Sequence, residues 1–203
     1  MMHIITGSAR GTRLFTLQGD NTRPTAERTK EAVFSMLPLD LSHRRVLDLF
    51  AGSGQMALEA LSRGAARAVL VDRERAAIDV IRRNAEKTHL ADRATVVCAD
   101  SLSYLARCGE QAFHLVFLDP PYASGLLPRA LEQLLSHGLL TPGATVVAEC
   151  PRQEALFGGD EALSARFEIL KQKRYGAAHV FFLTPALAGG RYSIGQEDCE
   201  CTP

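Results

Sequence analysis

The sequence predicts a single α/β domain in which helices cover both faces of a mostly parallel sheet. The first observation is an alternation, from Arg45 onward, of short apolar runs with longer helical patterns. The second is that these runs are apolar at consecutive positions, as expected of strands buried on both faces. The third is size, because 203 residues with 46% hydrophobic content suffice for one compact core.

The first 40 residues are expected to form a small extension of this domain. Residues 3–17 alternate imperfectly and contain two glycines, which predicts a short hairpin. Arg23-Pro24-Thr25 then opens a helix, with Thr25 as its N-cap and Glu27 in its first turn. Pro38 ends that helix because it cannot continue the hydrogen-bond ladder.

Residues 41–185 are expected to form the main domain. Five buried strands are predicted, at Val46–Phe50, Ala68–Val71, Thr95–Cys98, Leu115–Leu118 and Thr145–Ala148. Helices are predicted between them, at Gln55–Ser62, Arg75–Lys87, Leu102–Ala106 and Leu127–His137. Phe167–Arg174 and Ala178–Leu183 predict an antiparallel hairpin at the sheet edge, which completes a seven-stranded, doubly wound, Rossmann-like sheet. Residues 186–203 have few apolar side chains and predict a disordered tail.

Composition excludes several classes of protein. Basic and acidic residues balance, 23 against 23, so the chain is not a polycation that coats nucleic acid, although the mildly basic first 35 residues favour a local phosphate contact. The five cysteines form no CxxC pair and the six histidines no ligand spacing, so we expect no metal site. Neither a membrane span nor a signal peptide is evident, and a cytoplasmic location is expected.

A glycine turn, Asp48-Leu49-Phe50-Ala51-Gly52-Ser53-Gly54, follows the first predicted strand. In an open parallel sheet, ligands bind at the carboxyl ends of the strands, where the strand order reverses. Gly52 and Gly54 permit a tight turn and close approach of a ligand. Residues 52–57 also fit the loose dinucleotide pattern G-x-G-x-x-A, so the glycines alone leave a nicotinamide cofactor open. Asp48 favours a ligand with a cationic group, because a carboxylate repels a pyrophosphate.

Two further acids end the next predicted strands. Asp72 lies at the distance downstream where an acid holds ribose hydroxyls in nucleotide-binding folds. Asp100 ends the third strand and could accept a hydrogen bond from an adenine amino group. Their shared position predicts that both acids line one ligand site, although each could also be a solvated loop acid or a helix cap.

The most informative motif is Asp119-Pro120-Pro121-Tyr122, which follows the apolar run Leu115–Leu118. Two prolines force the chain out of the sheet in a stiff, extended turn. The exocyclic amine of a base is a poor nucleophile, because its lone pair is delocalised into the ring. Asp119 and the carbonyl of Pro120 can accept its two hydrogens, while Tyr122 stacks on the base, which contributes about 1–3 kcal/mol. Held in this way, the amine nitrogen could attack an electrophile, and for an already activated one, such as a methyl group on a sulfonium, placement would account for most of the rate.

With these motifs in place, the chain resembles the bacterial 16S rRNA guanine-N2 methyltransferases, the RsmD-like group of class I S-adenosylmethionine-dependent methyltransferases. The resemblance extends from about Ile4 to Leu183 and includes Arg23-Pro24-Thr25, the glycine turn, Leu58–Ala65 and the proline turn. It implies transfer of a methyl group from S-adenosylmethionine to the N2 amine of a guanine in 16S rRNA, guanine 966 in that family. The implied partner is 16S rRNA within the small ribosomal subunit or its assembly intermediate, and a monomer is expected.

The resemblance also implies roles for particular residues. The target guanine would be held by Asp119, Pro120, Pro121 and Tyr122. The cofactor would be bound by Asp48, Phe50, Ala51, Gly52, Gly54, Asp72, Arg73, Asp100 and Ser101. The RNA would be contacted by Arg10, Arg13, Arg23, Thr25 and Arg28.

Three alternatives stay open. Methylation of adenine N6 in RNA or DNA would use the same four-residue turn. A nicotinamide-dependent oxidoreductase fits the glycine pattern but leaves the proline turn unexplained. A non-catalytic RNA-binding assembly factor could retain the whole fold.

Overall fold

A computed structural model describes residues 2–17, 24–109, 111–121, 124–176 and 178–186, and the side chains of residues 24–26 are not described. Arg23, Tyr122 and the predicted tail beyond residue 186 therefore lie outside the described residues.

The centre of the protein is a seven-stranded sheet with the order β3-β2-β1-β4-β5-β7-β6. The first five strands run parallel to one another, and β7 pairs antiparallel with both β5 and β6. The strands are β1 (Arg45–Asp48), β2 (Arg67–Asp72), β3 (Ala94–Cys98), β4 (Phe113–Leu118), β5 (Leu140–Cys150), β6 (Phe167–Tyr175) and β7 (Ala178–Pro185). The mixed, seven-stranded sheet with its carboxyl-terminal hairpin confirms the predicted fold class.

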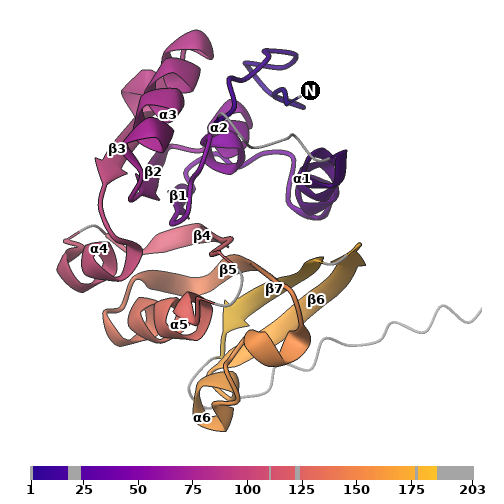
Figure 1. Cartoon of the computed structure of the whole chain (residues 1–203), viewed down its shortest axis with the longest axis vertical. Coiled ribbons are helices and arrows are strands. Elements are labelled where there is room, and N and C mark those ends of the chain that lie inside the picture. Colours follow the sequence, from indigo (N-terminus) through magenta and orange to yellow (C-terminus); the bar gives the residue numbers. More distant parts are fainter. Residues whose placement is uncertain (1, 18–23, 110, 122–123, 177, 187–203) are drawn as a thin grey trace, which may run out of the picture.

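Helices cover both faces of the sheet. One face carries α1 (Pro24–Met36), α2 (Gln55–Ser62) and α3 (Arg75–Lys87), whose apolar side chains share a single core cluster. The other face carries α4 (Ser101–Arg107), α5 (Leu126–Ser136) and the short α6 (Glu161–Ser164), which share the second cluster. Figure 1 shows α1 and α2 on one side of the sheet and α4 and α5 on the other. We call these the α2 face and the α5 face.

The strand order reverses between β1 and β4. The chain passes from β1 to β2 and β3 in one direction, and α4 then returns it to the opposite side of β1, where β4 and β5 follow. At such a switch point the loops after the two central strands diverge, which leaves room for a ligand above their carboxyl ends. The glycine turn follows β1 and the proline turn follows β4, so this point of the fold joins the two motifs.

The helix and strand assignments agree with the prediction except at several boundaries. Thr25 is the second residue of α1 and is therefore not the N-cap. Pro24 takes the first helical position, where an N–H group would make no hydrogen bond within the helix, so proline is tolerated there. β5 begins at Leu140, earlier than Thr145, because Leu140 pairs with Phe113 before an irregularity in the register. Two 3-10 turns, η1 (Ala91–Arg93) and η2 (Gln153–Ala155), and α6 were not predicted, since segments this short carry no measurable periodicity.

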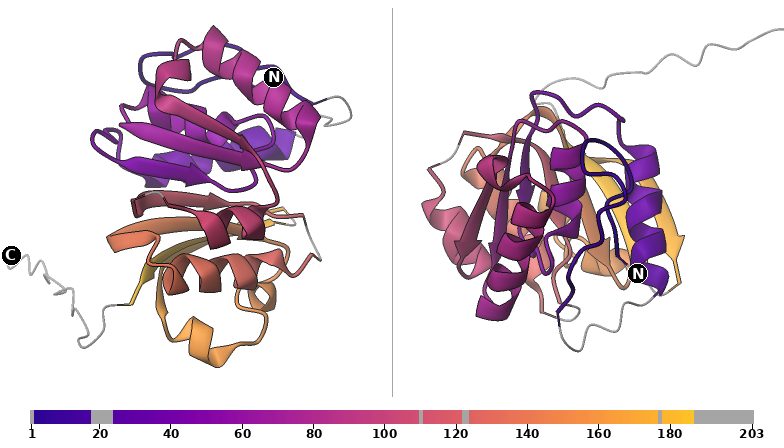
Figure 2. Two further views of the ribbon diagram at one scale, coloured as in Figure 1. Left: turned by 90° about the vertical axis from the view of Figure 1, so that its left-hand side faces the viewer. Right: turned by 90° about the horizontal axis from the view of Figure 1, so that it is seen from above.

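The N-terminal segment is held as a tight loop. The predicted hairpin is present only as one antiparallel bridge, between His3 and Arg13, and residues 2–17 form turns but no regular strand. Gly7 lies against α2 so closely that a Cβ there would come within 1.9 Å of the Ser62 carbonyl oxygen. Figure 2 shows the segment beside α2 and α3. Packing on α2, more than strand pairing, therefore determines where this loop lies.

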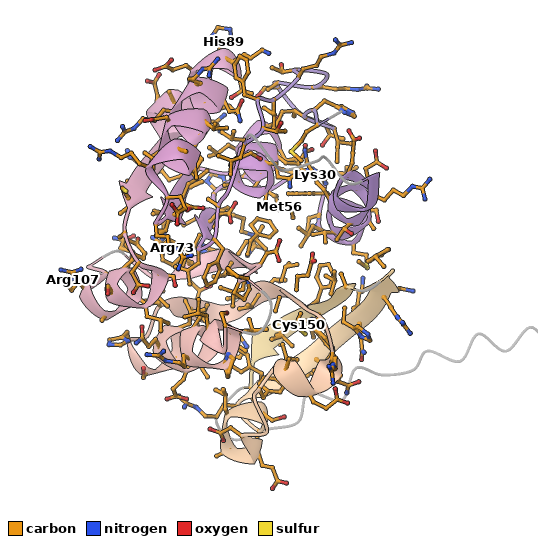
Figure 3. All side chains as sticks on the ribbon, viewed as in Figure 1. Lys30, Met56, Arg73, His89, Arg107 and Cys150 are labelled. Carbon is orange, nitrogen blue, oxygen red and sulfur yellow. The ribbon has the colours of Figure 1, made fainter. Side chains whose placement is uncertain are left out.

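A buried charge cluster joins this loop to α1 and α2. Glu59 is fully buried and accepts hydrogen bonds from the backbone N–H groups of Ile5 and Thr6, at 2.7 and 3.0 Å. Lys30 Nζ lies 3.2 Å and Arg63 Nε 3.3 Å from the same carboxylate. Lys30 extends from α1 toward α2, as Figure 3 shows. These partners hold the pKa of Glu59 below its ordinary value against the effect of burial, which raises it.

Among the described residues, none of the helices combines the length and the hydropathy that crossing a bilayer requires.

Candidate active site

Four acids end four neighbouring strands at one edge of the sheet. Asp48 is the last residue of β1 and Asp72 the last of β2, while Asp100 follows β3 and Asp119 follows β4. Because the four strands are parallel and adjacent, their carboxyl ends meet at the same edge. The structure therefore brings together the acids that the sequence predicted to share a site.

The glycine loop leaves space on one side and packs tightly on the other. Gly52 has a φ of +53°, and a Cβ built on it would meet nothing within 4 Å. Gly54 has a φ of +79°, and its Cβ would lie 3.0 Å from Leu70 and 3.3 Å from Ile81. Gly54 thus lets the loop pack on the core, whereas Gly52 exposes backbone toward open space above the sheet. Phe50 is half-buried and Ala51 buried in the same loop.

Asp72 orients the glycine loop. Its Oδ2 accepts from the backbone N–H of Gly52 at 2.9 Å, and its Oδ1 accepts from the N–H of Glu74 at 2.9 Å. The carboxylate is therefore fixed by two backbone donors, and each oxygen keeps a second lone pair for a ligand hydroxyl. The role in holding ribose stays a prediction, and the role in holding the loop is an addition to it.

Asp48 is a buried carboxyl group at the base of the same loop. It is 4% exposed and accepts from the N–H of Ala57 at 3.3 Å. Burial raises the pKa of Asp48 to about 7, and the nearby carboxylate of Asp72 adds to the rise. Such a group is ionised most favourably when a cation lies beside it. A second polar group in this region lacks a partner among the described residues. Gln55 Oε1, in the first turn of α2, is buried without a hydrogen-bond donor in the described part of the chain.

Asp100 caps a helix. Its Oδ1 accepts from the N–H of Ser103 at 2.9 Å, and this bond holds the pKa of Asp100 below its ordinary value. Ser101 is buried as the first residue of α4, and Arg73 is exposed and paired with Glu74 at 3.1 Å. Capping is the structural alternative that the sequence left open for Asp100, and contact with an adenine stays a prediction.

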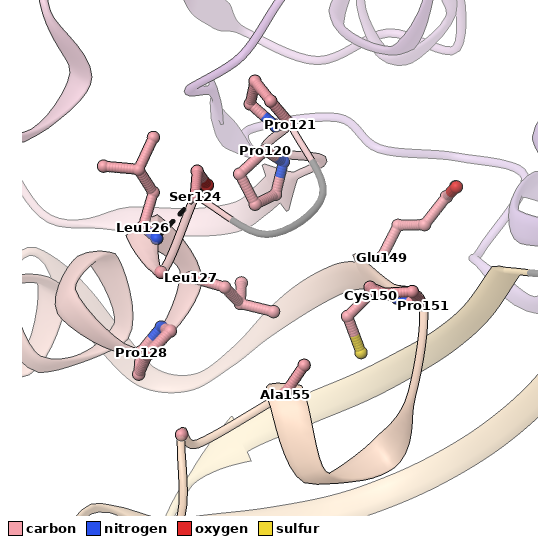
Figure 4. Close-up of a pocket in the computed structure, with 12 residues that line it drawn as sticks. Pro120, Pro121, Ser124, Leu126, Leu127, Pro128, Glu149, Cys150, Pro151 and Ala155 are labelled. Atoms are coloured by element: carbon pink, nitrogen blue, oxygen red, sulfur yellow. Dashed lines mark hydrogen bonds between the residues drawn. The ribbon is translucent and has the colours of Figure 1, made fainter.

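The proline turn lies beside a hollow of about 170 Å³ that is open to solvent. Figure 4 shows Pro120 and Pro121 on one side of it and Cys150 and Ala155 on the other. The walls come from the turn after β4, the start of α5 and the segment after β5. Tyr122, the predicted stacking residue, lies outside the described residues.

Asp119 lies at the opening of the site. Solvent reaches the residue, yet dense protein surrounds its carboxyl group on the remaining sides and raises its pKa to about 7. The carboxylates of Glu149 and Asp48 raise it further, in that order. Asp48 pairs in register with Phe117, two residues before Asp119, so the glycine and proline turns leave adjacent strands at the same edge of the sheet.

The arginines predicted to contact RNA lie on the surface of the N-terminal segment and α1. Arg10 and Arg13 are exposed in the loop, and Arg28 is exposed on α1. Arg23 and the side chain of Thr25 are not among the described parts of the structure. The described arginines are therefore available for contact with a partner, and a specific role for each stays a prediction.

Sequence reasoning missed three polar residues of this region, Gln55, Glu59 and Glu149. The signal for Glu59 was a charged residue within an otherwise apolar helix, since α2 is buried from Ala57 to Ser62. Glu149 gave a similar signal, as an acid near the end of the apolar strand β5. Gln55 has no signal of its own in the sequence. Across the described ranges, no group of three or more His, Cys, Asp or Glu side chains could hold a metal ion.

This fold and this arrangement of strand-end acids define a protein of the class I methyltransferase fold. The structure of the Escherichia coli protein yhhF superposes with a TM-score of 0.78 and 31% identity, covering 91% of this chain and 97% of that one. Ribosomal protein L11 methylase from Lactobacillus delbrueckii subsp. bulgaricus shares the fold, with a TM-score of 0.67 and 20% identity, over 86% of this chain and 84% of that one.

Similarity in sequence also identifies the family to which the chain belongs. The family model described as "Conserved hypothetical protein 95" matches residues 2–184. Ribosomal RNA small subunit methyltransferase D of Escherichia coli (strain K12) is 36% identical over 155 residues, which cover 76% of this chain and 77% of that protein. The chain therefore belongs to this family, and the resemblance noted from its motifs is confirmed.

Proposed function

We propose that the protein transfers a methyl group from S-adenosylmethionine to the N2 amine of a guanine in 16S rRNA. The observation that carries the proposal is the juxtaposition, at the switch point of the sheet, of the glycine loop after β1 and Asp119 after β4. Family membership supports it, because relatives in this family are named as small-subunit rRNA methyltransferases.

The residues of the first turn fit the cofactor. The buried carboxyl group of Asp48 suits its ammonium group, and Gly52 provides open space beside the loop. Asp72 presents an oriented carboxylate to ribose hydroxyls, and Gln55 Oε1 offers an acceptor that has no partner in the described part of the chain. When bound, S-adenosylmethionine supplies a methyl group on a positively charged sulfur.

Asp119 and Pro120 hold the amine that receives the methyl group. The carboxylate and the Pro120 carbonyl accept its two hydrogens, so that the nitrogen lone pair turns out of conjugation with the ring. With the cofactor bound, the nitrogen held in this way would bond to the methyl carbon as the carbon–sulfur bond breaks, and the amine would lose one proton. Asp119 can take that proton, because its pKa is raised to about 7. Placement in line is the main contribution to rate.

The substrate is RNA that presents an extruded base, since a base stacked in a helix cannot enter this space. Overall charge is balanced, which suits a small subunit or assembly intermediate better than long naked RNA. Arg10, Arg13 and Arg28 supply local positive charge on the N-terminal segment and α1.

The test is mass spectrometry of 16S rRNA from cells with and without the gene. We expect one N2-methylguanine to disappear with the gene and to return with the wild-type chain but not with Asp119→Ala. Unchanged N2-methylguanine after deletion would refute the proposal. If Asp119→Ala restored the modification fully, the catalytic assignment would be wrong. If purified wild-type protein binds RNA but methylates nothing, a non-catalytic assembly factor is supported instead.

A further inference from the structure

A second carboxylate lies beside Asp119 on the same face of the sheet. Phe117 of β4 and Val147 of β5 are partners in the parallel register, and both belong to the core cluster of the α2 face. Side chains alternate between faces along a strand, so Asp119 and Glu149, each two residues further on, are directed to that same face. Adjacent strands are about 4.8 Å apart. The two carboxyl groups are therefore neighbours at the sheet edge.

Figure 4 agrees with this placement. The Glu149 side chain points away from the Cys150 side chain, toward the opposite side of β5. Cys150 belongs to the core cluster of the α5 face, as Ala148 does. Glu149 is half-buried, so its carboxylate is partly removed from water at the opening where Asp119 lies.

The charges of the two groups act on each other. After burial, Glu149 is the largest cause of the raised pKa of Asp119, ahead of Asp48. Two carboxylates that repel each other across one opening are both ionised most favourably when N–H donors or a cation lie between them. Glu149 is not needed for the parallel ladder, because a side chain takes no part in backbone pairing.

A guanine meets this requirement and an adenine does not. The edge of guanine that carries the N2 amine also carries the N1–H group beside it, so two adjacent atoms donate hydrogen bonds. The edge of adenine that carries the N6 amine has an unprotonated N1, which is an acceptor. A carboxylate facing N1 therefore attracts guanine and repels adenine, and a well-placed pair of hydrogen bonds discriminates by about 1–3 kcal/mol in base recognition.

We propose that Glu149 accepts the N1–H of the target guanine while Asp119 and Pro120 hold its N2 amine, so that Glu149 selects guanine over adenine. The assignment rests on the proposed function. Glu149 is a positioning and specificity residue, since it touches the base but not the transferred methyl group. It decides between the two amine substrates that the proline turn alone left open.

The experiment uses small subunits reconstituted with 16S rRNA that carries either guanine or 2-aminopurine at the methylated position. 2-Aminopurine keeps the N2 amine but lacks both the N1–H and the O6 of guanine, and the loss of O6 affects the wild type and the Glu149 variant alike, so the change in preference between them reports the contact of Glu149 with N1. We compare kcat/KM on both substrates for the wild type and Glu149→Gln, whose amide can donate to an unprotonated N1. The preference for guanine should fall at least about tenfold in the variant. Glu154→Gln, an exposed acid in η2, is the matched control and should keep the wild-type preference.

The outcomes separate the two proposals. If Glu149→Gln lowers kcat/KM equally on both substrates, Glu149 has only a structural role and the inference is overturned. If the wild type methylates neither substrate, the proposed function fails together with the inference. Should Glu149→Gln fold poorly, Glu149→Asp keeps the charge and must retain a preference for guanine at reduced kcat. Equal use of both substrates by that variant would also overturn the inference.

Discussion

The backbone N–H of Gly52 donates to Oδ2 of Asp72 over 2.9 Å, so an acid at the end of β2 holds the loop that follows β1. The other oxygen of Asp72 accepts from Glu74 over 2.9 Å. Two backbone donors on different loops thus fix the orientation of the Asp72 carboxylate. The shape of the loop and the proposed ribose contact therefore depend on one side chain.

Asp72→Ala should weaken cofactor binding, because it removes both the hydrogen bond that holds the glycine loop and the proposed contact with the ribose. Hydrogen bonds to charged groups contribute about 1.5–3 kcal/mol each, so we expect a dissociation constant for S-adenosylhomocysteine at least about tenfold higher. Isothermal titration calorimetry measures it. Asp79→Ala, which removes an exposed acid from α3, is the control and should bind normally. Equal affinity of Asp72→Ala and wild type would show that Asp72 contacts neither the loop nor the ligand in a way that matters.

Cofactor binding should depend on pH through Asp48. The pKa of this carboxyl is raised from 3.8 to about 7, so between these values the folded protein holds a proton that the unfolded chain has lost. The ligand-free fold therefore loses stability as pH rises through that window. A cationic partner requires the ionised form, so affinity for S-adenosylhomocysteine should increase from one pH unit below that pKa to one above. Asp48→Asn should flatten the profile, and a wild-type profile in this variant would contradict the assignment.

Asp119→Asn should separate chemistry from cofactor binding. The amide keeps one acceptor oxygen but loses the charge and the ability to take a proton, so kcat should fall by about 100-fold or more. The dissociation constant of S-adenosylhomocysteine should stay within about twofold, because the proposed role of Asp119 is to hold the target base and not the cofactor. Single-turnover kinetics with saturating cofactor provides the rate. Weakened cofactor binding with an unchanged rate would place Asp119 in the cofactor site instead.

Glu59→Gln should be strongly destabilising. The variant leaves Lys30 and Arg63 buried without their common counter-charge, and breaking a buried ion pair in this way costs about 3–5 kcal/mol of unfolding free energy. Glu132→Gln provides the comparison, since its 2.7 Å pair with Arg166 is exposed and should contribute less than about 1 kcal/mol. Denaturant unfolding measures both. Similar losses of unfolding free energy in the two variants would show that the buried charge cluster does not stabilise the fold more than an exposed ion pair does.

Two glycines of the N-terminal loop allow conformational strain to be separated from close contact. Gly7 and Gly11 have nearly equal φ angles, +79° and +81°, but only the Cβ of Gly7 would collide, with the Ser62 carbonyl of α2. Gly11→Ala should lose about 1–2 kcal/mol from backbone conformation alone. Gly7→Ala should lose more and should release the loop from α2, which limited proteolysis detects. Equal losses of stability in the two variants would mean that the loop can move away from α2 without a cost in free energy.

Much of the architecture could be predicted from local pattern. The buried strands showed as consecutive apolar residues, and the helices showed as a period near 3.6, because burial on one or two faces imposes these repeats. Short segments were missed, since α6 and the 3-10 turns span too few residues for a repeat. The N-cap of α1 was misplaced at Thr25 because proline and the residues around it carry overlapping signals for the first turn.

The sequence by itself determined which residue types end each strand, including Asp48 and Asp119, since motif and strand end are contiguous in the chain. Only the tertiary structure decided which of these ends are neighbours, because strand order is set by how helices pack on the two faces of the sheet. That order places Glu149 beside Asp119, 30 positions away in the chain, and buries Asp48 deeply enough to raise its pKa. Burial and proximity across strands are properties of the packed core, and no local pattern records them.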